Sequence, residues 1–315
     1  MSELPTSRRF VFILTAVAVG ICSATQARIN GSLGAALASG VHSATVSFGV
    51  GLAVLILITL CIPRAQRGLT QVIRALGNRS MPWYGLLGGV LGAVFVLAQG
   101  VAVPTLGVAM FMTSMVLGQL LGSLVVDATG FLGAPKRGIS LFRVLGAILT
   151  AVAVVIIGLG TSLSAAAIPL LIFGVFAGVC ISLQMAVTGL VNVHAGEPVA
   201  PGLVNFFTGT IVLAIAAVIA QVAGWVDVQP FPGPGEWYLY IGGALGVLYL
   251  IVVAAVVRHL GVFLLTLSVV AGQLIGALIF DLAAGHVSIL VLIGVPLAFL
   301  GIVVANLTTL RRPGH

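Results

Sequence analysis

Ten long runs of apolar residues dominate this sequence, and they limit the folds that are open to it. Each run has roughly 20 residues, the length that an α-helix needs to cross about 30 Å of hydrocarbon. Transmembrane β-strands would instead show short segments of alternating polarity. With 60% hydrophobic and 6% charged residues, the chain cannot offer a water-soluble surface. We therefore expect an all-α integral membrane protein with ten transmembrane helices, at residues 10–29, 41–62, 83–103, 107–127, 141–160, 167–193, 201–223, 237–257, 261–283 and 287–308.

The connections between these runs are short. The longest are 63–82 and the Pro/Gly-rich 224–236, and both are predicted to be loops that leave no room for a soluble domain. The sequence has no phosphate-binding loop, nucleophile motif or pair of catalytic carboxylates, and its cysteines and histidines lack metal-ligand spacing. We therefore expect neither an enzyme nor a cofactor, and a function that is carried out within the membrane.

The second half of the chain repeats the first. The segment VLGQLLGSLVVDATG at 116–130 reappears as VAGQLIGALIFDLAA at 270–284, and its polar letters are rare in such apolar surroundings. Further matches follow in the same order in both halves: Gly20, Cys22 and Gln26 with Gly178, Cys180 and Gln184, and Gly88, Gly89 and Gly92 with Gly242, Gly243 and Gly246. This order indicates a duplication of a unit of about 150 residues, with a first repeat at 1–160 and a second at 161–315.

The basic residues predict the orientation of the chain. If the N-terminus is cytoplasmic, twelve of the 13 Lys and Arg residues lie on the cytoplasmic side and only Arg28 lies on the other. This distribution explains the net charge of +7 by topology and by attraction to anionic membrane lipid, without nucleic acid. Each repeat has an odd number of helices, so the two repeats cross the membrane in opposite senses and both termini are cytoplasmic. Such inverted repeats around a shared site are typical of alternating access.

Several residues of the first half carry a resemblance to a known family: Gln26 and Asn30, Ser47 and Phe48 with Gly51, Gly88 and Gly89, and the segment from Gly118 and Gln119 to Asp127. The pattern resembles the YdcZ-like family of bacterial inner-membrane proteins, within the drug/metabolite transporter superfamily. Members are often single five-helix units, and this chain resembles two of them fused. The resemblance implies a ten-helix transporter of the bacterial cytoplasmic membrane, with a central cavity lined by helices 1, 3, 4, 6, 8 and 9. It names no substrate.

Polar residues inside the apolar runs are the candidates for a substrate site, because an unsatisfied polar group in hydrocarbon is costly and is usually turned inward. Gln26 and Asn30 are four residues apart and share a helix face, and Gln184 and Thr188 repeat that spacing. The alternative role for such residues is hydrogen bonding between helices. The predicted substrate-binding residues are Gln26, Asn30, Gln119, Gln184, Thr188, Gln273 and Tyr249.

Asp127, Asp281 and Arg28 are the candidates for coupling or gating. The two aspartates are the only acids that the sequence places near the hydrocarbon, at helix ends on opposite faces of the membrane. Either they carry a proton or cation at each mouth, or they accept hydrogen bonds from loop amides at the interface, which we favour. Lys136 or Arg137 is the expected partner of Asp127. Arg28 either holds an anionic substrate group or extends to lipid phosphates.

The small multidrug resistance proteins of the same superfamily carry a glutamate in their first helix, whereas residues 10–29 and 167–193 contain no acid. This difference argues against a proton-coupled exporter of hydrophobic cations and favours a neutral, zwitterionic or weakly charged metabolite. We predict a secondary active transporter of a small polar metabolite, working as an exporter, by proton exchange or facilitated diffusion, and present as a monomer or a homodimer. The alternatives are a non-transporting scaffold or regulatory subunit and a lipid translocase.

Overall fold

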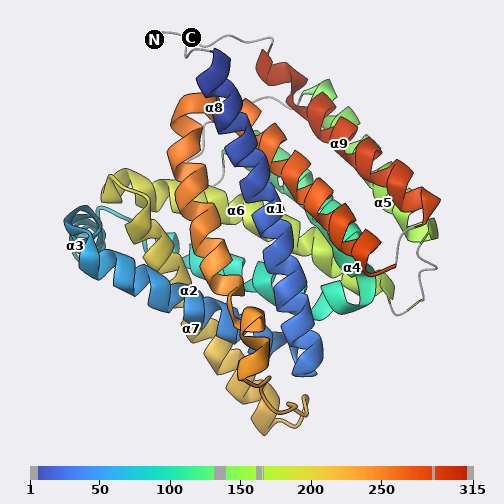
Figure 1. Ribbon diagram of the computed structural model, residues 1–315. Helices are drawn as coiled ribbons and strands as arrows, with labels where there is room; N and C mark the ends of the chain where they lie inside the picture. The colour runs from blue at the N-terminus through green and yellow to red at the C-terminus, as the bar shows by residue number, and fades with distance from the viewer. Residues whose placement is uncertain (1–5, 131–139, 161–164, 166, 286–287, 311–315) are drawn as a thin grey trace.

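A computed structural model describes residues 6–130, 140–160, 165, 167–285 and 288–310, and this part of the chain contains helices and no strand (Figure 1). The elements, in chain order, are α1 (Thr6–Ala36), α2 (Gly40–Cys61), α3 (Pro63–Gly77), the 3-10 helix η1 (Trp83–Leu86), α4 (Leu87–Thr129), α5 (Leu141–Gly160), α6 (Ala167–Ala195), α7 (Val199–Val222), the 3-10 helix η3 (Pro234–Tyr240), α8 (Gly242–Ala283) and α9 (Ile289–Leu310).

Two glycines divide the longest helices into separate membrane spans. The continuous helical segment Trp83–Thr129 has 47 residues and would extend about 70 Å if straight, more than twice the thickness of the hydrocarbon. It is broken at Gly107, which has a φ of 75° and a ψ of 170°, a conformation that residues with a Cβ atom rarely adopt. Gly261 breaks α8 in the same way, with a φ of 72° and a ψ of 164°. The predicted boundaries at 107 and 261 are therefore confirmed, and the described residues form ten spans.

Equivalent helices of the two halves run in opposite directions. The end of α1 lies beside η3, where the Gln229 N–H donates to the Leu37 carbonyl oxygen at 3.1 Å. The end of α6, in contrast, lies at α3, where Gly68 packs against Glu197. These two ends are separated by the length of α2, as Figure 1 shows, and we call them the η3 side and the α3 side.

Two close crossings join helices from different halves. Gly20 and Gly272 meet where α1 crosses α8, and Gly118 and Gly178 meet where α4 crosses α6. At each of the four glycines, an added Cβ atom would lie 1.9 to 2.0 Å from a backbone oxygen of the other helix. Small residues permit such close approach of membrane helices and so increase their van der Waals contact. We call these two contacts the glycine crossings.

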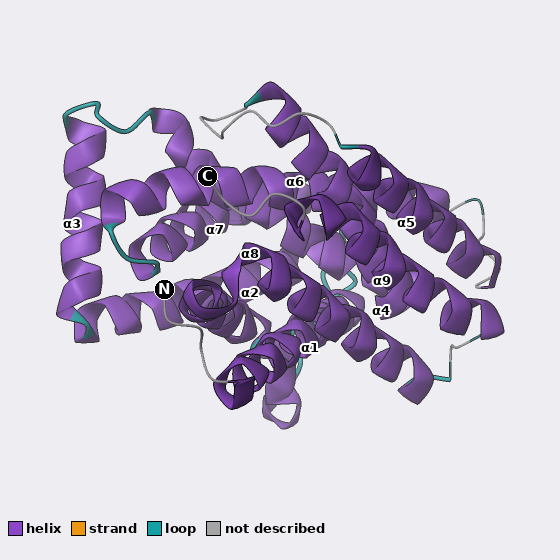
Figure 2. Ribbon diagram, turned by 90° about the horizontal axis from the view of Figure 1, so that it is seen from above, coloured by secondary structure: helices purple, strands orange, loops and turns teal. Residues whose placement is uncertain are grey.

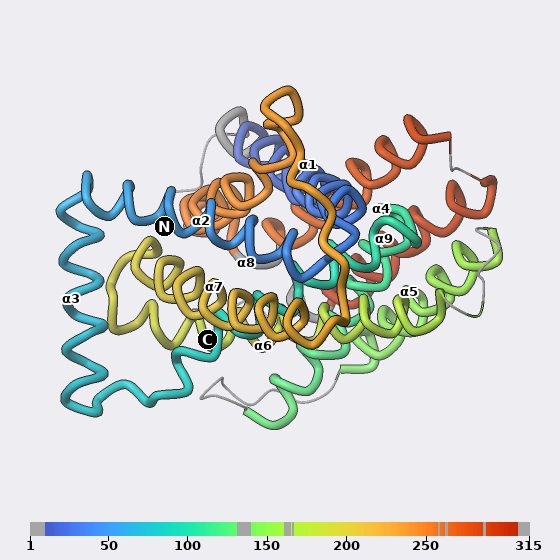
Figure 3. Tube along the Cα trace, turned by 90° about the horizontal axis from the view of Figure 1, so that it is seen from below, coloured from blue at the N-terminus to red at the C-terminus, as the bar shows by residue number. Residues whose placement is uncertain are grey.

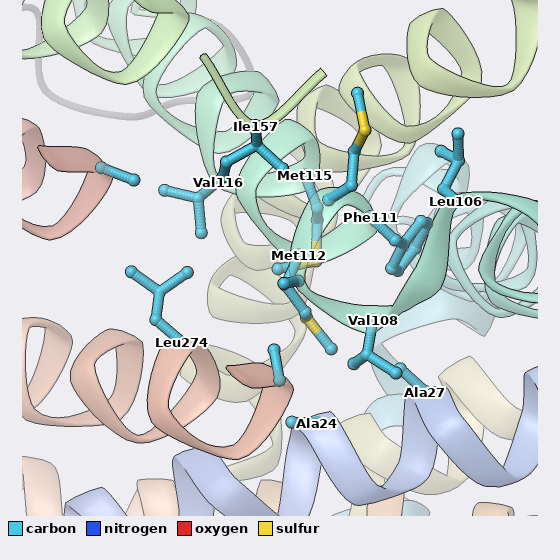
Figure 4. Close-up of a cluster of buried hydrophobic side chains, with 14 of the residues drawn as sticks. Ala24, Ala27, Leu106, Val108, Phe111, Met112, Met115, Val116, Ile157 and Leu274 are labelled. Atoms are coloured by element: carbon cyan, nitrogen blue, oxygen red, sulfur yellow. The ribbon is translucent and has the colours of Figure 1, made fainter. Parts of the chain in front are cut away.

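The main apolar core surrounds the second part of α4. Residues 108–116 of this helix are all buried. Figure 4 shows Val108, Phe111, Met112, Met115 and Val116 among Ala24 and Ala27 of α1, Ile157 of α5 and Leu274 of α8. Away from this core, α5 and α9 pack side by side at the edge of the molecule opposite α3 (Figures 2 and 3). The second part of α4 is therefore held by helices from both halves.

The prediction of a loop over 63–82 is wrong, because this segment contains α3. Pro63 occupies the first turn, where a helix tolerates proline, and Ala65, Gly68, Val72 and Ala75 form a buried stripe three to four residues apart. This stripe packs on α6 and α7, while Arg64, Arg67 and Arg74 are exposed. The segment is too polar for a membrane span but has the period of an amphipathic helix.

We expect Gly272→Ala to destabilise the protein, because the added Cβ would lie 2.0 Å from the Val17 carbonyl oxygen and would force α1 and α8 apart. Gly49→Ala is the matched control, since a Cβ at Gly49 of α2 meets no atom within 4 Å and alanine favours a helix by up to about 1 kcal/mol over glycine. Thermal unfolding in detergent should show a lower Tm for the first variant only. Equal Tm values would contradict the role given to the glycine crossings.

Candidate functional site

A cavity of about 360 Å³ lies between helices of both halves. Residues of α1, α4, α6 and α8 line it. These are the helices that the family resemblance implied, because α4 contains the third and fourth of the ten spans and α8 contains the eighth and ninth. Helices α2 and α7 contribute as well. Its polar lining residues are Ser23, Gln26, Gln119, Gln184, Thr188, Asn192, Asn205, Tyr249 and Gln273. Six of the seven predicted substrate-binding residues are therefore at the cavity, and Asn30 is the exception.

The glycine crossings position two of the cavity glutamines. Gln273 directly follows Gly272 on α8, and Gln119 directly follows Gly118 on α4. Because the backbones approach so closely at each glycine, the next side chain is held beside the neighbouring helix. The Gln273 Nε2 donates to Ser23 Oγ of α1 at 3.2 Å, while at the other crossing the backbone carbonyl oxygen of Gln119 accepts from Ser182 Oγ of α6 at 2.8 Å. Each crossing therefore has a glutamine that faces the cavity.

Two further glutamines lie over glycines of the facing helices. A Cβ added to Gly246 of α8 would be 3.1 Å from Gln26 Nε2, and a Cβ added to Gly92 of α4 would be 2.6 Å from Gln184 Nε2. The missing side chains thus make room for the two amide groups. Because Gly246 and Gly92 are equivalent positions of the two halves, this arrangement occurs twice around the cavity.

Two amide oxygens at the cavity have no hydrogen-bond partner. Asn205 Nδ2 donates to Thr188 Oγ1 at 2.8 Å, which leaves Asn205 Oδ1 without a donor. Gln273 Oε1 also lacks a donor, although the side chain is only 3% exposed. An unsatisfied buried acceptor costs about 1–3 kcal/mol, so a ligand that donates to either oxygen would gain that energy back.

Aromatic rings form much of the apolar wall. Phe48 of α2 and Phe206 of α7 are equivalent residues, and their ring centroids are 4.9 Å apart. Phe95 of α4 and Tyr249 of α8 are a second equivalent pair, and all four residues line the cavity. The wall is therefore suited to a flat apolar surface.

The cavity is closed towards the η3 side. Asn30 Nδ2 donates to Gln99 Oε1 at 2.7 Å, and both side chains are fully buried, at 0% exposure. One turn further along α1, a Cβ added to Gly34 would be 2.2 Å from the Gly100 carbonyl oxygen. Asn30 was predicted to bind substrate, but it instead ties α1 to α4 where these helices close the cavity.

The cavity reaches the α3 side, where the equivalent helices stand apart. Asn192 and Ala254, which are the counterparts of Gly34 and Gly100, line the cavity, as does Pro198 between α6 and α7. In the described part of the chain α6 and α8 hardly touch, whereas α1 packs closely on α4. The two equivalent helix pairs therefore differ: α1 and α4 are in contact and close the cavity on the η3 side, whereas α6 and α8 are separated and leave it open on the α3 side.

Asp281 accepts backbone hydrogen bonds near a helix end, the alternative that we favoured, but its donors belong to the break in α4 and not to a loop. Its carboxylate is 5% exposed and accepts from the backbone N–H groups of Val108 and Ala109, at 2.9 and 2.8 Å. The break at Gly107 leaves these N–H groups unpaired within their helix, and the positive end of the helix dipole favours a carboxylate there. Asp281 therefore caps the second part of α4, on the η3 side.

Asp127 forms an ion pair with Arg143 at the start of α5. The expected partners Lys136 and Arg137 lie outside the described residues. Both members of the pair are about one-fifth exposed, as suits the end of a membrane helix on the α3 side. Arg28, the remaining candidate, is half-buried on α1 and does not line the cavity.

Glu197 is a buried acid that sequence reasoning missed. It is 6% exposed, and its carboxylate accepts from Val199 N and Ala200 N at 2.9 and 2.6 Å, which caps α7. Its position just before Pro198 and a helix start was the available signal. Asn192 and Asn205 were missed because their counterparts, Gly34 and Ser47, are different residue types.

We expect Asp281→Ala to destabilise the protein, because it leaves two buried N–H groups without an acceptor. Hydrogen bonds to charged groups contribute about 1.5–3 kcal/mol each, so the Tm should fall by several degrees. Asp281→Asn, which keeps one side-chain oxygen, should have an intermediate Tm. Asp227→Ala changes an exposed aspartate and is the control. A Tm for Asp281→Ala that equals the control would show that the cap has no structural role.

Comparisons with known proteins agree with this architecture. The family model described as "Putative inner membrane exporter, YdcZ" matches the chain twice, over residues 11–156 and 169–304. A solved structure described only as "Crystal structure of protein" shares 18% sequence identity with it, covers 98% of this chain and 100% of its own, and has a TM-score of 0.59, so the two share a fold. No curated protein matches the chain.

Proposed function

The chain belongs to the YdcZ family of inner-membrane exporters, and on that premise we propose that it is a secondary transporter that moves a small polar metabolite by alternating access. Membership makes it a multi-pass inner-membrane protein of an exporter family. The metabolite class, the mechanism and the direction are the proposal. It rests on the cavity, which combines amide groups with an apolar wall and is large enough for a small molecule.

The observation that carries the proposal is the difference between the two ends of the cavity. Equivalent helix pairs are closed on the η3 side, between α1 and α4, and separated on the α3 side, between α6 and α8. Exchanging these two arrangements would open the cavity to the other side without changing the fold, which is how inverted repeats produce alternating access. We assign the repeats to 1–160 and 161–315, since the family model matches once within each.

We assign the α3 side to the cytoplasm. Four arginines follow α2 on this side, Arg64, Arg67, Arg74 and Arg79, and all are exposed. Such a basic segment fits the excess of positive charge on cytoplasmic loops and the anionic lipid of the inner leaflet. The cavity then opens to the cytoplasm, where an exporter takes up its substrate. It is enclosed by a single chain, so a monomer suffices and a homodimer is not required.

The two alternative functions fit the cavity less well. A scaffold has no need for an open cavity that is lined with amide groups. A lipid translocase needs a cationic group inside to receive the phosphate, and the described lining residues include no arginine or lysine. Arg143 pairs with Asp127 instead.

We expect the double variant Gln26→Ala/Gln184→Ala to lose transport, because it removes both amide groups that lie over Gly246 and Gly92. Proteoliposomes loaded with labelled amines, amino acids, sugars, organic acids and amides identify the solute that wild-type protein releases, and its efflux should slow at least tenfold in the variant. Gln221→Ala, at an exposed position of α7, should transport normally. The proposal fails if wild-type protein moves no solute, or if the double variant matches Gln221→Ala.

We expect the cavity to be accessible from the cytoplasm. In a protein whose native cysteines Cys22, Cys61 and Cys180 are replaced by serine, Asn192→Cys should react with a membrane-impermeant maleimide in inside-out vesicles. Trp225→Cys, exposed in the connection after α7, should react in right-side-out vesicles only. Exclusive labelling of position 192 from the outside would reverse the assigned orientation.

A further inference from the structure

We propose that the cavity selects an uncharged molecule with a flat apolar body and N–H or O–H groups at its edges. The inference rests on the proposed function, because it names the class of molecule that the same cavity carries. Three properties of the lining lead to it: its charge, its aromatic wall and its unpaired acceptors.

The first property is the neutrality of the cavity. None of the described residues that line it is an acid, an arginine, a lysine or a histidine. The buried acids close to the helix bundle are already engaged, Glu197 at the start of α7 and Asp281 at the break in α4. An ion that enters the cavity would lose hydration without meeting an opposite charge, which is unfavourable. Both ends of a zwitterion would meet the same penalty.

The second property is the aromatic wall. Phe48, Phe206, Phe95 and Tyr249 could attract a cation, but cation–π contacts return less free energy than the desolvation of an ammonium group costs. The same rings bind a flat apolar or aromatic body without that cost, through offset or edge-to-face contacts. The wall therefore selects the body of the ligand and not a charge.

The third property is the pair of unpaired acceptors. Gln273 Oε1 on α8 and Asn205 Oδ1 on α7 are buried and receive no hydrogen bond from the protein. Both side chains are 3% exposed, and their amide nitrogens are already used on Ser23 and Thr188. A ligand N–H or O–H group would satisfy either oxygen once its side chain turns the oxygen towards the cavity, which both residues line. Amide and hydroxyl groups supply such donors without a charge.

Matched probes test the selection by charge. Indole-3-acetamide, indole-3-acetate, tryptamine and tryptophan share one ring system and are, near pH 7, neutral, anionic, cationic and zwitterionic. Benzamide, benzoate and benzylamine form a second series. With purified full-length protein in detergent, isothermal titration calorimetry should show that the uncharged member of at least one series binds tenfold or more tighter than its charged analogues. Tighter binding of a charged member, or no binding of either amide, would overturn the proposal.

A charge introduced into the cavity should reverse the preference. Gln119→Glu places a carboxylate at a half-buried lining position, and it should gain at least tenfold in tryptamine affinity while losing affinity for indole-3-acetamide. Gln221→Glu adds the same charge at an exposed position of α7 and should leave both affinities unchanged. Gln184→Glu repeats the test from α6 if the first variant does not fold. An equal gain of tryptamine binding in Gln221→Glu would overturn the proposal.

Flux separates this inference from the proposed function. In proteoliposomes, the bound uncharged probe should leave the vesicles down its own concentration gradient, and only where the protein is present. Binding of the amide without any flux would overturn transport and leave the ligand class intact. Flux of a charged metabolite, with no binding of the uncharged probes, would overturn the ligand class and leave transport intact.

Discussion

The close approach of backbones at the glycine crossings is the constraint on which the rest of the structure depends. Lipid tails are as apolar as the helix surfaces, so burial of apolar area does little to hold membrane helices together, and close packing has to do it. The crossings join α1 to α8 and α4 to α6, and each therefore links the two halves. Gln273 and Gln119, which line the cavity, directly follow Gly272 and Gly118 in the sequence. At each crossing, two adjacent residues therefore serve both purposes: the glycine packs the helices, and the glutamine lines the cavity.

Because the two halves are equivalent, the cavity has two equivalent ends, one on the η3 side and one on the α3 side. The residues at these two ends are not identical. On the closed side Asn30 donates to Gln99. On the open side the counterpart of Gln99 is Val253, which offers no side-chain hydrogen bond, and Thr188 pairs with Asn205 of α7 instead. Closing α6 against α8 therefore cannot reproduce the hydrogen bond that closes the η3 side. The two states of such a transporter would differ in energy through these few side chains, while the crossings remain the same.

Much of the fold follows from the sequence alone, because long apolar runs permit few structures in a bilayer and repeated glycines mark the breaks at 107 and 261. The repeat also predicted the four cavity glutamines. It could not predict residues without a like counterpart, such as Asn192 and Asn205. Hydropathy missed α3, whose stripe of small residues is buried by α6 and α7 and not by lipid. Asn30 shares a helix face with Gln26, but only the packing of α1 on α4 decides which of the two reaches the cavity.

The structural roles of the two buried acids, Asp281 and Glu197, connect the fold to the chemistry of the cavity. A helix that starts inside the protein has N–H groups without partners, and a carboxylate at the helix start satisfies them. Asp281 serves this purpose at Gly107, and Glu197 does the same at the start of α7. A carboxylate that accepts two backbone hydrogen bonds is held in place and turned away from the substrate. The buried acids of the described chain are therefore used to hold helix starts, and the lining of the cavity contains no charged residue.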